Sequence, residues 1–262
     1  MADFTQHLGE LFRYRELVKN LVARDLKARY KNSVLGFAWC LMNPLLMMGV
    51  FTLVFGVLMR NNIPNFPIFL LIGLLPWNLT ASSVMGSMGS ITGNGHLIKK
   101  VYFPRELLPI STVFSNLVNF LLACIVLAGM LLAFRVTLSP LYLYFPVILL
   151  IHLIFLLGLA FLFSSLNVFY RDTEVIMEVV MLAWFFMTPI FFNIEDLTAN
   201  FSRLMYIANP MASIISTYRM VLLYDSPPAA DFLLRTLATS VAVLLIGYWF
   251  FRRQAPAFGE EV

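Results

Sequence analysis

The sequence predicts an all-α integral membrane protein with six transmembrane helices, and two observations support this fold class. First, 60% of the 262 residues are hydrophobic and only 12% are charged, whereas charged residues make up about 25% of an average soluble domain. Second, the apolar residues gather in runs of roughly 20, the length that a helix needs to cross a ~30 Å hydrocarbon core. A chain so poor in charge cannot cover a water-exposed surface, so most of it is expected to face lipid.

Residues 1–32 are predicted to form an amphipathic interface helix. Apolar side chains recur there at intervals of three and four, as at Tyr14, Leu17 and Leu21, which is a helical stripe. The rest of the segment is basic, and a basic amphipathic helix without a spanning apolar run lies on the membrane surface. No apolar core of a signal peptide is visible. We therefore expect this helix and the N-terminus to lie on the cytoplasmic side.

Residues 33–253 are expected to form one six-span domain, followed by a cytoplasmic tail at 254–262. The expected spans are 34–59, 68–91, 107–134, 147–169, 175–192 and 232–251. Asn43-Pro44 interrupts the first span, and a proline inside a helix predicts a kink there. The second span contains Gly73 and Pro76, so we expect it to be broken or closely packed against its neighbours.

Residues 193–231 are too polar for a span and too apolar for a free loop. Two short helices are expected on either side of Asn209-Pro210, re-entering the outer interface as a periplasmic gate. Asparagine is a favoured N-cap, and proline suits the first helical turn that follows it. Asn209 and Pro210 are therefore the candidate gate residues.

The basic residues predict the orientation of the chain. With the N-terminus inside, the cytoplasmic segments hold seven of the 18 Lys and Arg before residue 33, three between 96 and 106, and then Arg171, Arg252 and Arg253. The outer side holds Arg60, Arg135, Arg203, Arg219 and Arg235. Because cytoplasmic loops of membrane proteins are enriched in Lys and Arg, both termini are expected in the cytoplasm.

Several kinds of chemistry are disfavoured by what the sequence contains. It has no G-x-x-x-x-G-K-[ST] pattern for nucleotide binding, and His7, His96 and His152 are too scattered for a metal cluster. The net charge of +4 is too small to indicate a nucleic acid partner. No catalytic or metal-binding residue is predicted. No ionisable residue falls in the middle of an expected span, which disfavours a proton-coupled carrier and favours energy supplied by another subunit.

The stretch HLIKKVYFPRELLP, which starts at His96, is the best candidate for contact with such a subunit. It is a short, basic, proline-containing segment between two spans, with apolar side chains that could fill a groove on a partner. An ordinary charged turn remains the alternative. The candidate coupling residues are Leu97, Lys99, Lys100, Val101, Phe103, Pro104, Arg105 and Glu106.

A second contact is predicted between the fourth and fifth spans. Its candidate residues are Arg171, Asp172, Glu174 and Glu178. The alternative is that the carboxylates simply favour the N-terminal end of the helix dipole.

The chain resembles the membrane subunits of bacterial ABC-2 type exporters, in particular those for O-antigen, capsular polysaccharide or teichoic acid. The similarity covers nearly the whole chain and is most specific in LIKKVYFPRELLP and NVFYRDTEVIMEV. It implies a homodimer in the bacterial inner membrane, paired with two copies of a cytoplasmic P-loop ATPase that binds the ATP and Mg²⁺. It also implies that segment 96–106 is a coupling helix, and that a lipid-linked polysaccharide moves through a pore between the two copies.

Aromatic side chains are the candidates for that pore, because the C–H faces of sugars stack on aromatic rings. Most of the 25 Phe are expected to face lipid or the core. The candidate pore residues are Trp39, Phe51, Phe55, Trp77, Tyr142 and Phe169. Two alternatives remain open: an ABC-2 exporter of a small amphiphile or drug, and an integral membrane enzyme acting on lipid-linked sugars.

Overall fold

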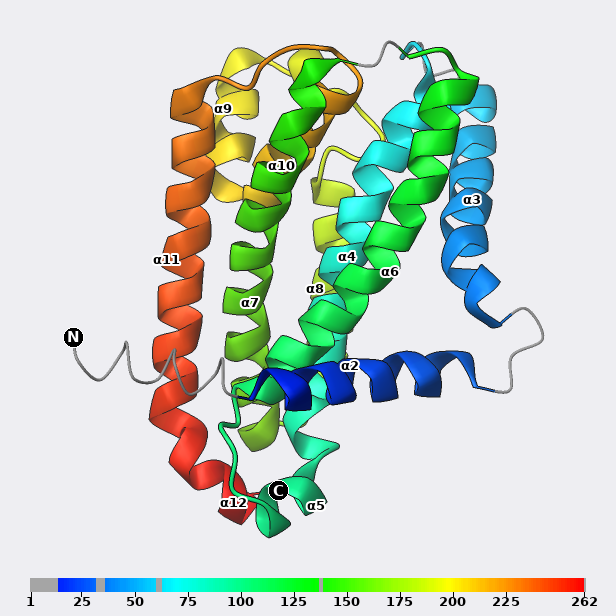
Figure 1. The fold of residues 1–262 in the computed structure, drawn as a ribbon. Helices are drawn as coiled ribbons and strands as arrows, with labels where there is room; N and C mark the ends of the chain where they lie inside the picture. The colour runs from blue at the N-terminus through cyan, green and yellow to red at the C-terminus, as the bar shows by residue number, and fades with distance from the viewer. Residues whose placement is uncertain (1–13, 32–35, 60–62, 137–138, 262) are drawn as a thin grey trace.

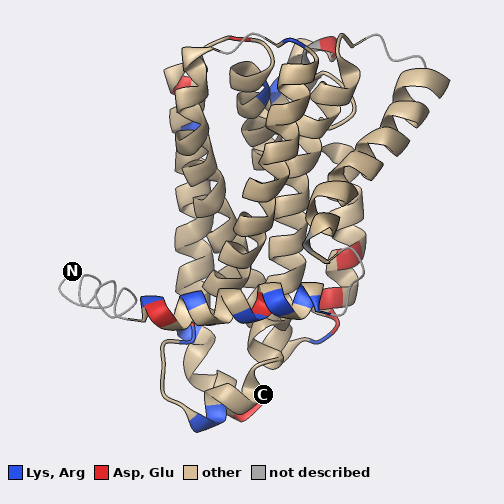
Figure 2. Ribbon diagram, turned by 45° about the vertical axis from the view of Figure 1, so that its right-hand side comes forward, with Lys and Arg blue, Asp and Glu red and all other residues tan. Residues whose placement is uncertain are grey.

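The computed structural model describes residues 14–31, 36–59, 63–136 and 139–261, which form an all-helical bundle without strands in these ranges (Figure 1). The long helices run between two ends of the molecule. We call the end beside α2, α5 and α12 the lower end, and the end beside α9 the upper end (Figure 1). Helix α2, Arg15–Tyr30, crosses the lower end of the bundle roughly at right angles to the long helices (Figures 1 and 2).

Five helical segments of the described chain are long and apolar enough to cross a membrane. They are α3 Trp39–Phe51 continued by the π-helical η2 Thr52–Leu58, α4 Phe66–Thr92, α6 Leu107–Ala133, η3 Pro140–Tyr144 with α7 Phe145–Phe169, and α11 Ala230–Gln254 continued by η5 Ala255–Ala257 and α12 Phe258–Glu261. These segments confirm five of the apolar spans expected from the sequence, with ends that differ by up to ten residues. The expected start of the first span, 34–35, lies outside the described residues.

The fifth expected span is shorter in the structure than in the prediction. Helix α8 covers Thr173–Met187, 15 residues or about 22 Å of helix, and does not extend to Phe192. It ends at Met187, two residues before Pro189, and the intervening Thr188 is extended with φ −97° and ψ 137°. The residue before a proline disfavours helical backbone angles. The prediction that this helix reaches Phe192 is therefore wrong, because Pro189 ends it.

Helix α4 is the centre of the bundle. It packs against α3, α6, α7, α8 and α10, and side chains such as Ile68, Leu71 and Met88 are fully buried. The glycines and Pro76 in this span do not break it, because the helix continues from Phe66 to Thr92. The expectation of close packing is confirmed, and the expectation of a possible break is not.

Helices α7 and α11 approach so closely that their backbones touch. A Cβ added at Gly158 would lie 2.6 Å from the backbone N of Leu244, and one added at Gly247 would collide with the carbonyl of Gly158. Only glycine fits at these two positions. Small residues at such crossings let helices associate in lipid, where apolar side chains gain little by leaving the surrounding hydrocarbon.

The apolar stripe of α2 packs onto protein at the lower end. Leu21 is buried, and Leu17 and Val18 lie beside it against Leu107 and Leu108 at the start of α6. Residues 1–13 of the expected interface helix lie outside the described residues. Within the described part, α2 buries Leu21 against the bundle and its Lys and Arg are exposed, although Arg24 and Arg29 also donate hydrogen bonds to the bundle.

The segment between α8 and α11 contains the two short helices expected around Asn209-Pro210. They are α9, Ala199–Ala208, and α10, Pro210–Leu222. The Asn209 side chain accepts a hydrogen bond from the backbone N of Met211 at 3.1 Å, and Pro210 occupies the first turn. The predicted cap is confirmed. Both helices lie at the upper part of the molecule (Figure 1).

Candidate functional site

The lower tip of the molecule is formed by α5, Gly95–Lys100, and the turn that follows it (Figure 1). Lys99 and Lys100 are exposed, Val101 is 51% exposed and Tyr102 is 97% exposed. In Figure 2 this basic tip lies below α2, beyond the helices of the bundle. The structure thus presents the predicted segment as a projection with charged and apolar side chains on its outer surface.

Phe103 does not lie on that outer surface. The sequence analysis included it among the side chains that contact a partner, but it is 6% exposed and packs against Leu21, Leu107 and Leu108. Leu97 is partly buried beside the same cluster. The prediction that Phe103 faces a partner is therefore wrong. Its ring lies on the inner side of the tip and packs against α2 and α6.

Arg105 and Glu106 also face the chain itself. The Arg105 guanidinium donates a hydrogen bond from Nη1 to the carbonyl of Ala255 in η5, and Glu106 is 6% exposed. Of the tail expected at 254–262, residues 254–261 are described and fold against the bundle, since Phe258 packs on Phe251 with ring centroids 5.3 Å apart. The C-terminal residues and α2 therefore hold the tip from two sides.

A further hydrogen bond links α2 to the base of the tip. Arg24 Nη1 donates to Asn94 Oδ1 at 2.9 Å, and Asn94 directly precedes α5. Arg24 also pairs with Asp25 on its own helix at 3.0 Å. The tip and the crossing helix are thus joined by both apolar and polar contacts, so a displacement of one is expected to move the other.

The candidate second contact lies at the start of α8, also at the lower end. Arg171, Asp172, Glu174 and Glu178 are all exposed, and none of the four forms an ion pair within the described residues. These charges are accessible to a partner, and the carboxylates also lie favourably near the N-terminal end of the helix dipole.

Three of the six aromatic pore candidates come together. Phe51 and Phe55, at the junction of α3 and η2, pack on Phe191 with centroid distances of 5.1 and 4.5 Å. Trp77 of α4 joins them through Phe185 of α8, 5.5 Å away. Trp77 itself is only 5% exposed, so it supports the cluster from inside.

The other three candidates are scattered. Trp39 lines a separate cavity near α2. Tyr142 follows the upper end of α6 and its hydroxyl donates to the carbonyl of Leu222 at 3.4 Å. Phe169 lies near the lower end against Phe258, 6.1 Å away. The structure therefore does not place all six on one surface.

Sequence reasoning missed several residues of these sites. Tyr102 was overlooked between the lysines and Phe103, although an aromatic residue in a short charged loop is a signal for exposure to a partner. Phe185 and Phe191 were overlooked because phenylalanine is common in lipid-facing helices. Their clustering depends on the chain reversal at Pro189, which brings Phe191 back beside α3.

His152 is an ionisable residue inside the expected span 147–169, although it lies nearer the start of that span than its middle. It lies within α7 and is fully buried, with Nε2 2.9 Å from the hydroxyl of Thr80 on α4. Buried histidines of this kind frequently serve packing and hydrogen bonding. Here it joins two central helices.

Arg219 is a second buried basic residue. The charge count assigned it to the outer side, and the structure shows in addition that it is buried, 4% exposed on α10. Its guanidinium donates to the carbonyls of Phe69, Pro189 and Ile190 at 3.2, 2.5 and 2.9 Å, and it lies 3.4 Å from the centroid of the Phe69 ring. Arg219 thereby fixes α4, the turn after α8 and α10 to one another.

Asn209 makes the corresponding connection at the start of α10. Its Oδ1 accepts from Trp184 Nε1 at 2.9 Å, and its Nδ2 donates to the hydroxyl of Thr188 at 3.0 Å. Asn209, the candidate gate residue, is therefore 8% exposed and joins the start of α10 to the end of α8. This arrangement couples any movement of α10 to α8.

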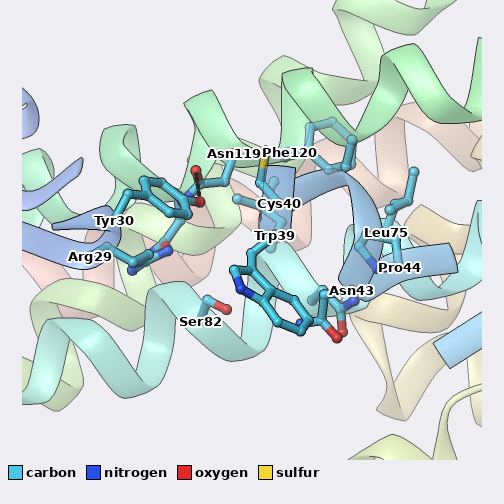
Figure 3. A pocket seen from close by; sticks show the side chains of 14 residues that line it. Arg29, Tyr30, Trp39, Cys40, Asn43, Pro44, Leu75, Ser82, Asn119 and Phe120 are labelled. Atoms are coloured by element: carbon cyan, nitrogen blue, oxygen red, sulfur yellow. Dashed lines mark hydrogen bonds between the residues drawn. The ribbon is translucent and has the colours of Figure 1, made fainter. Parts of the chain in front are cut away.

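A cavity of about 450 Å³ opens where the end of α2 meets α3, α4 and α6 (Figure 3). Its lining mixes a cation, aromatic rings and several side-chain amides, an unusual set for a lipid-facing bundle. The lining residues used below are Arg29, Tyr30, Trp39, Asn78, Ser82 and Asn119. Burial raises the pKa of the Tyr30 hydroxyl, so this group remains a neutral hydrogen-bond donor near pH 7.

The fold and the tip define a class of protein: a multi-pass helical membrane protein with a basic projection at one end and without a nucleotide-binding motif of its own. The chain belongs to the ABC-2 type transporter family, which residues 16–223 match. ABC-2 transporters work with an ABC ATPase partner, so the chain is a transport permease rather than an enzyme.

Named relatives agree with this assignment. The chain is 38% identical over 254 residues to the O-antigen export system permease protein RfbA of Myxococcus xanthus, covering 97% of this chain and 98% of the relative. It is 36% identical over 214 residues to a Klebsiella pneumoniae protein of the same name, covering 81% of each chain. Over 101 residues, 38% of each chain, it is 30% identical to the polysialic acid transport protein KpsM of Escherichia coli.

Proposed function

We propose that this chain is the membrane subunit of an ATP-driven exporter that moves a lipid-linked polysaccharide from the cytoplasm across the bacterial inner membrane. The relatives that match over most of their length are named for O-antigen export, which supports a glycan rather than a small amphiphile or drug. ATP and Mg²⁺ would be bound by a separate ATPase. This chain would convert the movement of that ATPase into a conformational change of its membrane-spanning helices.

The proposal includes six crossings, with both termini in the cytoplasm. Helix α7 ends at the lower end and α11 begins at the upper end (Figure 1), so the chain between them must cross an odd number of times. We assign that crossing to α8 with the turn after Pro189, and we assign α9 and α10 to short re-entrant helices on the periplasmic side. The excess of Lys and Arg at the lower end supports the cytoplasm as its location.

Cysteine labelling tests this orientation. In a chain lacking Cys40 and Cys124, single cysteines replace Ser139, Asn200 and Lys100. An impermeant thiol reagent added outside intact spheroplasts is expected to label positions 139 and 200 and to spare 100 until the membrane is permeabilised. Labelling of position 100 from outside would place the tip in the periplasm and contradict the proposed coupling.

The passage for the glycan is proposed to lie between two copies of the chain. Helix α3 with η2 is almost unburied in the single chain, and α8 exposes a row of large apolar side chains including Val175, Val179 and Leu182. Between these two surfaces lies the cluster of Phe51, Phe55, Phe185, Phe186 and Phe191. Such a face suits an interface of two copies around aromatic rings that a sugar chain can slide along.

The coupling role is supported by the two sides of the tip: its outer side is exposed, and its inner side is packed against the bundle. Tyr102 is 97% exposed, whereas Phe103, the next residue, is buried against α2 and α6. This arrangement gives a partner an aromatic and basic surface to bind and fixes that surface to the bundle. Aromatic residues at the centre of an interface commonly cost ~2 kcal/mol or more of binding free energy when truncated.

Co-purification of the permease with its ATPase tests the role of the tip. The variant Tyr102→Ala with Lys100→Glu is expected to insert and fold normally but to retain at least about tenfold less ATPase, and export should stop. Leu143→Ala is the matched control, because Leu143 is 82% exposed near the upper end. Undiminished ATPase retention and export in the tip variant would show that the segment is an ordinary charged turn.

A further inference from the structure

The cavity at the end of α2 contains a cation without a counter-ion. Arg29 Nη1 donates to the neutral amide oxygen of Asn116 at 3.0 Å, and no carboxylate lies within ion-pair distance of Arg29 among the described residues. The guanidinium also interacts with the Tyr30 hydroxyl, and Figure 3 shows Arg29 and Tyr30 side by side on the wall of the cavity. A guanidinium presents its donors in a planar fork that matches the oxygens of a phosphate.

Several uncharged polar groups surround this cation without satisfying one another. Tyr30 donates its hydroxyl proton to Asn119 Oδ1 at 2.8 Å, while the Asn119 Nδ2 group is shielded from solvent and has no partner in the structure. The side chains of Asn78 and Ser82, which also line the cavity, make no hydrogen bond within the described residues. A shielded amide without a partner is unfavourable, so an oxygen-rich ligand would improve this site.

The opposite wall supplies an aromatic surface. Trp39 is 44% exposed and contributes its indole to the cavity, and Figure 3 shows it between Ser82 on α4 and Asn43 on its own helix. An aromatic ring flanked by amide and hydroxyl groups is suited to a sugar, whose C–H face stacks on the ring while its hydroxyls take part in hydrogen bonds. A bare anion would use Arg29 but would leave Trp39 and Asn78 without a role.

The position of the cavity indicates how such a ligand arrives. The cavity begins beside the end of α2, the helix that crosses the lower end of the bundle (Figure 1), and extends to Leu79 and Phe120, near the midpoints of α4 and α6. A lipid whose tail stays in the bilayer would present its headgroup at the α2 end of this cavity.

We propose that this cavity binds the headgroup of a membrane lipid in which a phosphate is joined to a hydroxyl-rich group. Arg29 binds the phosphate, Asn78, Ser82 and Asn119 bind hydroxyl or carbonyl oxygens, and Trp39 packs on the C–H groups of the hydroxyl-rich part. The assignment of the lower end to the cytoplasm rests on the proposed function. The same chemistry fits the transported glycolipid and a resident phospholipid such as phosphatidylglycerol, so the experiment must separate them.

Binding can be measured on the purified permease without its ATPase, through the fluorescence of Trp39. The protein in detergent is titrated with a polyisoprenyl diphosphate bearing one hexose, with phosphatidylglycerol, or with inorganic phosphate. The glycolipid is expected to give a saturable change that is lost in Trp39→Phe, and inorganic phosphate is expected to bind far more weakly. Glycolipid binding stronger than phosphatidylglycerol binding supports the transported lipid as the ligand, and equal binding supports the phospholipid.

Substitutions decide whether the signal arises at this site. Arg29→Gln is expected to weaken binding at least about tenfold, whereas Lys27→Gln, an exposed cation on the same helix, should leave it unchanged. Asn78→Ala provides a second test, because loss of an amide without hydrogen bonds should weaken binding and leave thermal stability intact. No saturable signal with either lipid, or equal effects of Arg29→Gln and Lys27→Gln, would overturn the proposal. Because no ATPase is present, such a failure would leave the test of the α5 tip unaffected.

Discussion

Helices α3 and α4 are consecutive spans of similar apolar composition, but the share of their residues that is buried differs widely. In the most apolar part of α4, 78% of the residues are buried, whereas in the segment formed by α3 and η2 only 6% are buried. Leu71 on α4 is fully buried, and Leu53 on η2 is 56% exposed. Apolar composition alone therefore does not determine which span is at the centre.

The difference indicates two roles for the spans. Helix α4 is part of a fixed frame with α6, α7, α10 and α11, in which glycine contacts and buried hydrogen bonds define the geometry. Helix α3 touches that frame along one side and leaves the rest of its surface to lipid or to another protein. Our central claim is that this free surface, together with that of α8, meets a second copy of the chain.

The largest expected effect is at the crossing of α7 and α11 in the frame. Gly247→Leu would force side-chain atoms into the backbone of Gly158, and overpacking without room to relax commonly costs 1–3 kcal/mol or more. We expect little folded protein to be recovered in detergent. Gly49→Leu in α3 is the control, since a Cβ at Gly49 meets nothing within 4 Å. Recovery of folded protein is measured by size-exclusion chromatography. Equal recovery of the two variants would show that the α7–α11 crossing is no more tightly packed than α3.

A smaller but still large effect is expected at Arg219. Arg219→Met leaves the carbonyls of Phe69, Pro189 and Ile190 without their buried donor, and hydrogen bonds to charged groups contribute about 1.5–3 kcal/mol each. Because these contributions are not additive, we expect a loss of about 3–5 kcal/mol, seen as a lower thermal midpoint. Arg203→Met, at an exposed position on α9, should change the midpoint little. A midpoint for Arg219→Met equal to that of the control would mean that α10 is not held by this contact.

The most direct comparison of the two spans uses one substitution in both. Leu71→Ala in α4 is expected to cost about 2–4 kcal/mol of unfolding free energy, because it creates a cavity in a packed core. Leu53→Ala in η2 removes the same atoms from an exposed site and should cost less than about 1 kcal/mol in the isolated chain. Survival of folded protein after heating measures both. If Leu53→Ala is as damaging as Leu71→Ala, the exposed face of η2 is already covered by protein under the conditions used.

Much of the fold could be predicted from the sequence, because spans are set by runs of apolar residues and ends by charge, proline and capping. Asn209 and Pro210 start α10 as their residue types indicate. The end of α8 was missed because the run WFFMTPIFF is apolar except for Thr188, and hydrophobicity obscured the local effect of Pro189.

The candidate site was harder to predict, since its parts depend on which side of a short segment faces the bundle. Phe103 and Tyr102 are adjacent aromatic residues, but one is buried against Leu21 and the other is exposed. Their roles are set by the approach of α2, a contact between residues about 80 positions apart in the sequence. The polar cavity depends on the same docking, because Arg29 and Tyr30 reach α6 only when α2 lies across the lower end.

Disulfide cross-linking tests the central claim most directly. In a chain lacking Cys40 and Cys124, a single cysteine replaces Leu53 on η2, or Leu245 on α11 as the control, which is 60% exposed on another helix. Under mild oxidation in membranes, the Leu53→Cys chain is expected to form a covalent dimer and the Leu245→Cys chain to stay monomeric. Cross-linking through position 245 and not through position 53 would contradict the assignment of the α3 surface to the interface between copies.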